Sequence, residues 1–373
     1  MVAGAARRRP GELCLAQSST SSLGLAEAGG CDSFAPSDPP ERGGRGGPYA
    51  ALDLGTNNCR LLVARPTADG FRVVDAFSRI VRLGEGLSQT GRLSEAAIER
   101  TLEALRVCRD KMAARRVARA RLIATEACRA AENCGEFLDR VRERLGLRLE
   151  VVDRETEASL AVAGCGDLAD RNAESIVLFD IGGGSSEIIW LDCRRREPST
   201  VGRIAAWESL RLGVVTLSET FGGDEVTPEM FAAMKRRVLE ALAPFAARVS
   251  GRRRCRRFHL LGTSGTVTTI AGVHLNLKRY DRRAVDGLWL SSGEVDAAIA
   301  RLVAMSYAER AANGCIGAER ADLVLAGCAI LEAIRADFPA ERLRIADRGL
   351  REGILLQMMR ADRVGPHAHP AGA

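Results

Sequence analysis

Long apolar runs, aromatic side chains and lysine are all scarce in this chain of 373 residues. No run reaches the roughly 20 apolar residues of a membrane-spanning helix, so no membrane partner is expected. Aromatic residues make up only 4%, so aliphatic side chains must fill the cores of the two domains that this length predicts. Only three of the 54 basic residues are lysines, and the net charge is a mild +6. Nucleic acid is therefore not predicted as a partner, although a polyanionic substrate is compatible with this charge.

The cysteine pattern contains no C-x-x-C pair and no cysteine near a histidine at the spacing of zinc ligands. Eleven cysteines are also an odd number, which does not suit a fully paired disulfide framework. Most have apolar neighbours, as Cys165 and Cys328 do after Ala-Gly. We therefore expect buried thiols in a reducing compartment and a cytoplasmic location.

Several common catalytic signatures are also missing. The sequence has no G-x-x-x-x-G-K-[ST] and no G-x-G-x-x-G, which excludes a P-loop NTPase and argues against a dinucleotide fold. Its four histidines lie in no catalytic motif. A histidine-based triad or a phosphohistidine is therefore not supported.

The two ends of the chain differ from its middle. Residues 1–47 contain Arg7, Arg8 and Arg9, a Ser/Thr cluster and a Pro/Gly-rich stretch. This segment has no hydrophobic periodicity and no apolar stretch long enough for a signal peptide. We predict a disordered extension over residues 1–47 and a disordered tail over 363–373.

A strand–turn–strand pattern occurs twice, 127 residues apart. Apolar runs over residues 49–53 and 59–64 flank a Gly-Thr-Asn turn, and runs over 175–180 and 186–191 flank a Gly-Gly-Gly turn. Strands alternating with helices follow in both halves, which predicts α/β lobes. We place the first lobe at residues 48–160 and the second at 161–362, with the final helix packing back on the first lobe.

Each repeat places an aspartate at the end of the first apolar strand, with one apolar residue between it and the glycine turn. Asp53 precedes the first turn and Asp180 the second. Glycines let backbone N–H groups approach an anion closely, which is how phosphate oxygens are often held. An aspartate at that point can hold a metal ion or its waters. Two such turns in tandem therefore favour a phosphate site over ordinary hairpins.

Six motifs in order resemble the Ppx/GppA family (exopolyphosphatase / guanosine pentaphosphate phosphatase) of the actin / acetate-kinase superfamily. The resemblance covers about residues 49–360 and implies two actin-like (ribonuclease H-like) lobes, each a mixed sheet flanked by helices, with a cleft between them. The motifs are Ala51-Leu-Asp-Leu-Gly-Thr-Asn57, Thr125-Glu-Ala-Cys-Arg129, Arg154-Glu-Thr-Glu-Ala158, Phe179-Asp-Ile-Gly-Gly-Gly-Ser-Ser-Glu187, Gly262-Thr-Ser-Gly-Thr266 and Ile345-Ala-Asp-Arg-Gly-Leu-Arg-Glu-Gly353.

The resemblance also implies roles for individual residues. Glu157 corresponds to the family's catalytic glutamate, with Asp180 as its partner. Asp53, Asp180 and Glu187 are the expected ligands of Mg²⁺, or of Mn²⁺ in its place. Arg129 is the expected clamp on phosphate, although Glu126 stands where relatives often have a small residue. The remaining expected phosphate-binding residues are Gly55, Thr56, Asn57, Asn58, Gly182, Gly183, Gly184, Ser185, Ser264, Gly265 and Thr266.

The leading functional hypothesis is a phosphoanhydride hydrolase that acts on inorganic polyphosphate, on guanosine pentaphosphate, or on both. Two alternatives remain open: an actin-like ATP-dependent kinase for a small molecule, and a non-catalytic sensor of polyphosphate or alarmone. The motif around Glu157 favours water as the acceptor, because hydrolysis needs a carboxylate that orients and deprotonates water. The resemblance leaves a homodimer open.

Overall fold

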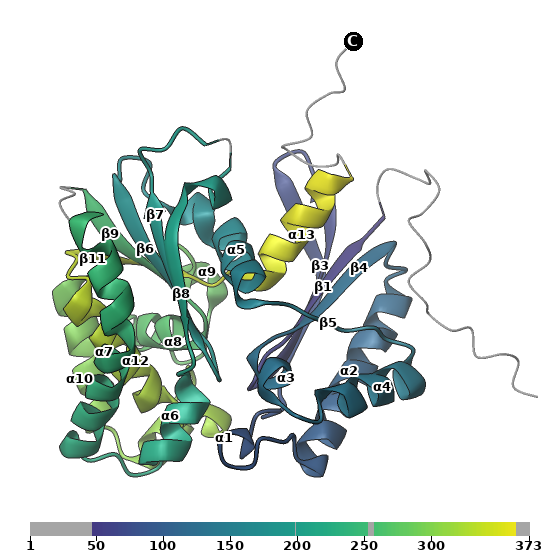
Figure 1. Cartoon of the computed structure of the whole chain (residues 1–373), viewed down its shortest axis with the longest axis horizontal. Helices are drawn as coiled ribbons and strands as arrows, with labels where there is room; N and C mark the ends of the chain where they lie inside the picture. Colours follow the sequence, from purple (N-terminus) through teal and green to yellow (C-terminus); the bar gives the residue numbers. More distant parts are fainter. Residues whose placement is uncertain (1–46, 198, 253–256, 363–373) are drawn as a thin grey trace, which may run out of the picture. The chain divides into compact units, whose positions relative to one another are not determined.

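The computed structural model describes residues 47–197, 199–252 and 257–362. Two sheets form its framework, one in each half of the chain (Figure 1). In sheet order, the first consists of β3 (Gly70–Ile80), β2 (Asn58–Thr67), β1 (Tyr49–Leu54), β4 (Arg119–Ala124) and β5 (Glu150–Val151). The second consists of β10 (Trp289–Ser291), β11 (Arg342–Ala346), β9 (Phe258–Thr263), β6 (Ser175–Ile181), β7 (Ser186–Asp192) and β8 (Ile204–Leu210).

The two sheets repeat one topology. β1 pairs antiparallel with β2 and parallel with β4, and β6 pairs antiparallel with β7 and parallel with β9. The hairpin turns also match, because Gly55 N donates to Asn58 O and Gly182 N donates to Ser185 O, each at 2.9 Å. The internal repeat and the two-lobed α/β architecture expected from the sequence are thus confirmed.

Each sheet has helices on its outer face. The apolar residues of β1 and β2 that point outward pack with α2 (Glu95–Ala114) and α4 (Cys134–Leu145). Ser94 caps α2 by accepting a hydrogen bond from Ala97 N. The second sheet packs in the same way with α7 (Pro228–Val249), α8 (Gly265–His274), α10 (Ser292–Ala304) and α12 (Val324–Asp337).

Two helices lie between the sheets, namely α5 (Arg154–Cys165) and α13 (Leu350–Ala361) (Figure 1). They share one apolar core with the inner faces of β1, β2, β6 and β7. Their backbones touch, since a Cβ at Gly353 would lie 2.1 Å from Leu160 O. The final helix therefore packs on the strands of the first lobe. The boundary that we predicted between residues 160 and 161 falls inside α5, which continues to Cys165.

The shorter elements complete the chain path. They are α1 (Leu87–Thr90), α3 (Glu126–Ala130), α6 (Val214–Phe221), α9 (Arg282–Val285) and α11 (Tyr307–Ala312). Within the described ranges, no helix is both long enough and apolar enough to cross a membrane. The two predicted disordered ends, apart from Gly47, lie outside the described residues.

Candidate active site

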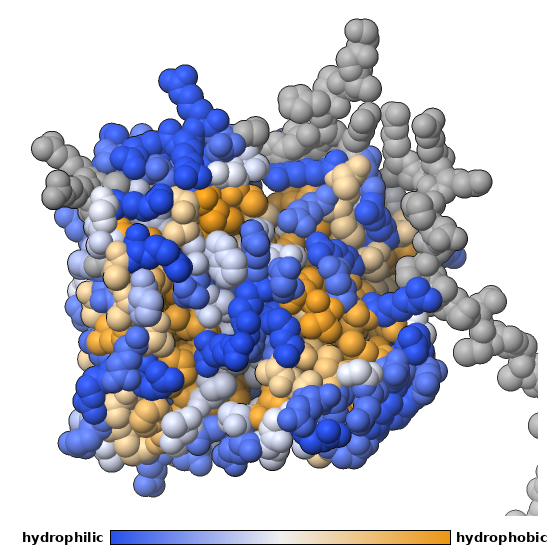
Figure 2. Space-filling model, in the orientation of Figure 1, coloured by the Kyte–Doolittle hydropathy of each residue, from blue (hydrophilic) through white to orange (hydrophobic). Residues whose placement is uncertain are grey.

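One cavity lies between the two hairpin turns, and almost every residue predicted for the site lines it. The exception is Arg129. The predicted residues that line the cavity are Asp53, Gly55, Thr56, Asn57, Asn58, Glu157, Asp180, Gly182, Gly183, Gly184, Ser185, Glu187, Ser264, Gly265 and Thr266. Motifs far apart in the sequence thus meet at one place. Figure 2 shows hydrophilic side chains gathered along the middle of one face, with apolar patches to either side.

The two turns pack directly against each other. A Cβ added at Gly184 would lie 2.6 Å from Thr56 Oγ1, and one at Gly183 would lie 3.2 Å from Asn57 N. Only glycine fits at residue 184 without moving the opposite turn. The same glycines that expose backbone N–H groups therefore also allow the two lobes to approach.

Features suited to an anion surround this contact. The N-terminus of α8, at Ser264–Thr266, opens into the cavity, and unpaired N–H groups at a helix start favour negative charge. Ser264 adopts a φ of 84°, and its Oγ donates to Ile181 O at 2.5 Å. Asn57 and Asn58 each bury an Oδ1 that has no hydrogen-bond partner in the described structure. These two oxygens accept hydrogen bonds, so they suit a water molecule or a cation beside the anion rather than the anion itself.

The carboxyl groups of Asp53, Glu157, Asp180 and Glu187 line the cavity, and each has a raised pKa. Burial, followed by the charges of Glu187 and Asp53, raises the pKa of Asp180 to about 7. Burial and the charge of Glu187 raise the pKa of Glu157, which is 6% exposed. Burial also raises the pKa of Asp53 and of Glu187, whose Oε1 accepts a hydrogen bond from Ser209 Oγ at 2.9 Å. Perturbed carboxyls gathered in a cleft are characteristic of a catalytic site.

Arg129 is turned toward carboxylates. Its Nη2 lies 2.7 Å from Glu157 Oε2 and 2.8 Å from Glu126 Oε2. Its Nε also donates to Glu126, and its Nη1 donates to the Val152 carbonyl. Arg154 also forms an ion pair with Glu126, with Nη2 of the arginine 2.9 Å from Oε1 of the glutamate. In this arrangement, Arg129 is an ion-pair partner of the glutamates rather than a lining residue of the cavity.

The Glu157 side chain is buried, but its Oε2 has no hydrogen-bond partner in the described structure. Its contact with Arg129 has the distance of an ion pair, yet no donor in the described structure is well aligned with Oε2 as a hydrogen bond. A fixed, buried carboxylate with an open acceptor position is what a water-activating base requires.

Three arginines line the cavity without a hydrogen bond or ion pair from their guanidinium groups to any described residue. They are Arg60 of β2, Arg320 of the short turn Ala318–Arg320, and Arg351 at the start of α13. Sequence reasoning missed them as site residues. Arg351 did fall within the last motif, but its side-chain environment was not foreseeable. Positive groups left uncompensated in a cavity favour an anionic ligand.

The expected metal ligands do not form a compact cage. Across residues 47–362, excluding the undescribed gaps, no three Asp, Glu, His or Cys side chains gather closely enough to hold a metal ion by themselves. Glu187 is turned toward Ser209, whereas Asp53 makes no hydrogen bond or ion pair with a described residue. This donor set suits Mg²⁺, which commonly takes one or two carboxylates and completes its shell with water and substrate phosphate.

Comparison with known proteins identifies the family. The model of the Ppx/GppA phosphatase family matches residues 62–362. The chain belongs to this family. The Ppx/GppA family member of Aquifex aeolicus is 28% identical, covers 85% of this chain and 99% of its own, and superposes with a TM-score of 0.68. An exopolyphosphatase-like protein is 29% identical, with 84% and 99% coverage and a TM-score of 0.74.

A third solved structure supports the fold alone. The exopolyphosphatase of Cytophaga hutchinsonii is 24% identical to this Ppx/GppA protein, covers 84% of this chain and 98% of its own, and has a TM-score of 0.76. The described residues therefore span nearly the whole of these relatives.

Contacts across the cleft hold the two lobes together beside the cavity. Arg82 Nη1 lies 2.9 Å from Asp322 Oδ2, and Arg82 Nη2 donates to Glu319 O at 3.1 Å. Glu219 accepts hydrogen bonds from Gly86 N at 2.8 Å and from Ser88 Oγ at 2.5 Å. We call these contacts the clasp. The cavity beside it encloses about 150 Å³, less than the roughly 300–1,000 Å³ that drug-sized ligands occupy.

Proposed function

We propose that this Ppx/GppA protein hydrolyses terminal phosphoanhydride bonds and releases orthophosphate from inorganic polyphosphate. The observation that carries the proposal is the position of Glu157. This buried carboxylate lines the same cavity as the two glycine turns that suit phosphate. A base placed beside a phosphate site is the arrangement that transfer of a phosphoryl group to water requires.

In the proposed reaction, the two glycine turns and the start of α8 hold the terminal phosphoryl group through backbone N–H donors. Glu157 orients a water molecule and accepts its proton as the water oxygen bonds to phosphorus. The bridging P–O bond breaks, and the electron pair leaves with the shortened chain. Arg129 keeps Glu157 in place and favours its ionised form.

Mg²⁺ would be held by Asp53 and Asp180 together with substrate oxygens, and it would neutralise charge on the phosphates. Without such a cation, burial raises the pKa of both carboxyls, and the charge of Asp53 raises the pKa of Asp180 further. Glu187 is not proposed as a direct ligand, because its Oε1 already accepts a hydrogen bond from Ser209. Its proposed role is electrostatic, through its charge near Asp180.

The lining of the cavity supports polyphosphate as the better substrate. No aromatic side chain is among the described lining residues, so a guanine base would have no stacking surface. Three arginines without partners offer charge instead, and a long polyanion gains from many such contacts. Guanosine pentaphosphate is the second candidate, because Ile316, Leu323 and Val324 form an apolar part of the cavity wall.

Phosphate release without any added acceptor tests the proposal. Both substrates are assayed with Mg²⁺ at about 50 and about 300 mM KCl, where charge screening differs strongly. We expect release from both substrates, a lower KM for polyphosphate, and a KM for polyphosphate that rises steeply with salt. Preference for the nucleotide at both salt concentrations would reverse the ranking. Transfer from ATP to a small acceptor without hydrolysis would favour the kinase alternative, and binding without turnover would favour a sensor.

A further inference from the structure

Arg351 is the one charged residue of its segment that has no partner in the described structure. Residues 347–351 enter the cleft and line the cavity. The neighbouring charges are matched: Arg348 Nη2 lies 2.5 Å from Asp286 Oδ2, and Glu352 Oε1 lies 3.0 Å from Arg282 Nη2. The guanidinium of Arg351 has neither a hydrogen bond nor an ion pair with any residue in the described ranges.

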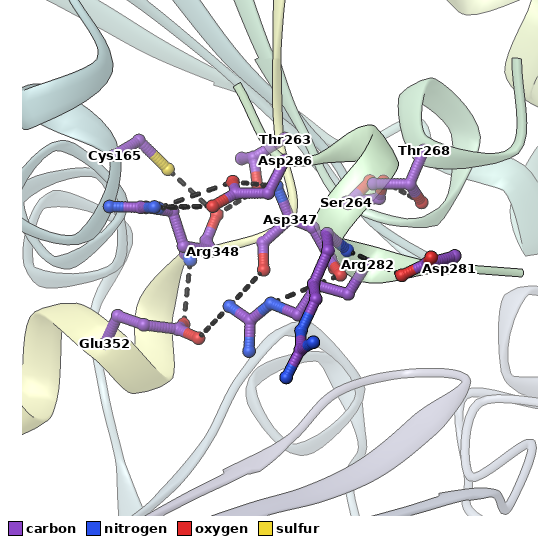
Figure 3. A network of polar contacts seen from close by, with 12 residues as sticks. Cys165, Thr263, Ser264, Thr268, Asp281, Arg282, Asp286, Asp347, Arg348 and Glu352 are labelled. Atoms are coloured by element: carbon purple, nitrogen blue, oxygen red, sulfur yellow. Dashed lines mark hydrogen bonds and ion pairs between the residues drawn. The ribbon is translucent and has the colours of Figure 1, made fainter. Parts of the chain in front are cut away.

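A polar network fixes the backbone that carries Arg351 (Figure 3). Arg282 donates to the Asp347 carbonyl at 2.6 Å as well as to Glu352. Glu352 accepts a hydrogen bond from Gly349 N at 2.9 Å, which closes the first turn of α13. The residues on both sides of Arg351 are therefore held. The backbone that carries the Arg351 side chain is therefore fixed by hydrogen bonds of neighbouring residues.

Charged groups of both signs surround Arg351. Asp53 and Glu352 lie near it with opposite charge, but Arg60 and Arg282 lie near it with like charge. Burial is the main reason that the pKa of Arg351 falls. Asp53 is not an ion-pair partner of Arg351, even though both line the cavity. The side chain of Arg351 is half-buried, and since no described residue pairs with its guanidinium, that group is available to a ligand that supplies negative charge.

We infer that Arg351 binds a phosphate group of the substrate at the end of the cleft formed by β1, β2 and the start of α13. Arg351 has five N–H donors in a planar fork, which suits bidentate contact with two phosphate oxygens. This inference rests on the proposed function, because it takes a polyphosphate to be the ligand. It assigns to Arg351 the phosphate contact that the sequence had assigned to Arg129.

Imidodiphosphate tests this inference, since its P–N–P bridge resists hydrolysis while its phosphate groups keep their charge. The full chain with Mg²⁺ is unfolded thermally with and without the compound, as wild type, Arg351→Ala and Arg351→Lys. Arg106→Ala is the matched control, because Arg106 is an exposed arginine on α2, far from the lining residues in sequence and absent from the cavity. The kcat/KM for tripolyphosphate is measured on the same four proteins.

The expected result separates a ligand role from a structural one. Arg351→Ala should unfold at the same temperature as wild type, or higher, without ligand. It should bind imidodiphosphate about tenfold or more weakly, and its kcat/KM should fall by a similar factor. Arg351→Lys should recover part of both losses, and Arg106→Ala should match wild type.

Three different outcomes would overturn the inference. If Arg351→Ala unfolds at a lower temperature without ligand but binds imidodiphosphate as wild type does, Arg351 is a structural counter-ion. If wild type binds imidodiphosphate and hydrolyses tripolyphosphate, and Arg351→Ala does both equally well, the inference fails while the proposed function stands. If wild type neither binds the first nor hydrolyses the second, both are wrong.

Discussion

Arg129 and Glu157 form an ion pair, with Nη2 of the arginine 2.7 Å from Oε2 of the glutamate. The pair joins α3 to α5, and Glu126 holds the arginine from its other side. The residue that the sequence suggested as a phosphate clamp thus touches the residue suggested as the base. Arg129 therefore acts on Glu157 electrostatically, because its charge lowers the pKa of that carboxyl.

Replacing Arg129 should therefore shift the pH dependence of activity. Burial and Glu187 raise the pKa of Glu157, and Arg129 opposes that rise. Because a general base acts when deprotonated, Arg129→Gln should move the acid limb of kcat/KM to higher pH by about one unit or more. Arg129→Lys should restore most of the shift. An unchanged acid limb combined with a higher KM would instead support the clamp role.

Asp180 should make the metal-free protein less stable as the pH rises. Its pKa is about 7 in the folded chain and about 3.9 when unfolded. The folded state therefore holds the proton more tightly, so the stability from this group is full below about pH 4 and is lost as the pH rises through about 7. In EDTA, the unfolding temperature should fall between about pH 5 and about pH 8, and less steeply in Asp180→Asn.

The same Asp180→Asn variant should lose turnover, and the size of its defect should depend on Mg²⁺ concentration if the carboxylate holds the ion or its waters. Glu103→Gln, at an exposed position on α2, is the control for removing one negative charge. A residual rate indifferent to Mg²⁺ would leave Asp180 with a positional role only.

The clasp should favour the closed cleft. Arg82→Ala and Asp322→Ala each remove the same ion pair, whose side chains are 33% and 18% exposed. We expect each variant to lower kcat/KM severalfold and the double variant to be no worse than the more damaged single variant, since contacting residues couple. Fully additive losses in this cycle would show that the two residues act separately.

Deletion of residues 1–47 should leave activity within about twofold, because the segment has no apolar pattern with which to form a core. The first strand begins at Tyr49, and Pro48 O already accepts a hydrogen bond from Ala118 N at 2.8 Å. A drop of several degrees in unfolding temperature on deletion would contradict this prediction.

The sequence predicted the repeated hairpins because their signals are local. An apolar strand that ends in Asp-Leu or Asp-Ile before a glycine turn predicts the same hairpin wherever the chain later folds, and both hairpins occur where expected. β8 was missed because six of its seven residues are only half-buried, so no alternation marks it. α12 and α13 were not predicted in detail, since their apolar residues face cores made by distant segments.

The arginines of the site illustrate the limit more sharply. The chain has 54 basic residues. Composition cannot distinguish an arginine that forms an ion pair with a carboxylate from one that lines a cavity without such a partner. Arg129 meets Glu126 and Glu157, and Arg351 lines the cavity without an ion-pair partner in the described ranges, only when α3, α5 and α13 come together. The partner of a charged side chain is a property of the tertiary structure, and local sequence carries little of it.

The most direct test of this account is the rate at which Glu157→Gln releases orthophosphate from polyphosphate in the presence of Mg²⁺, with no acceptor added. The variant keeps the shape of the side chain but removes the base. The account predicts wild-type release that falls by about 10²–10⁴-fold in Glu157→Gln, the usual range for a general base, while imidodiphosphate still binds. A near-normal kcat in this variant, or no release by the wild type, would contradict it.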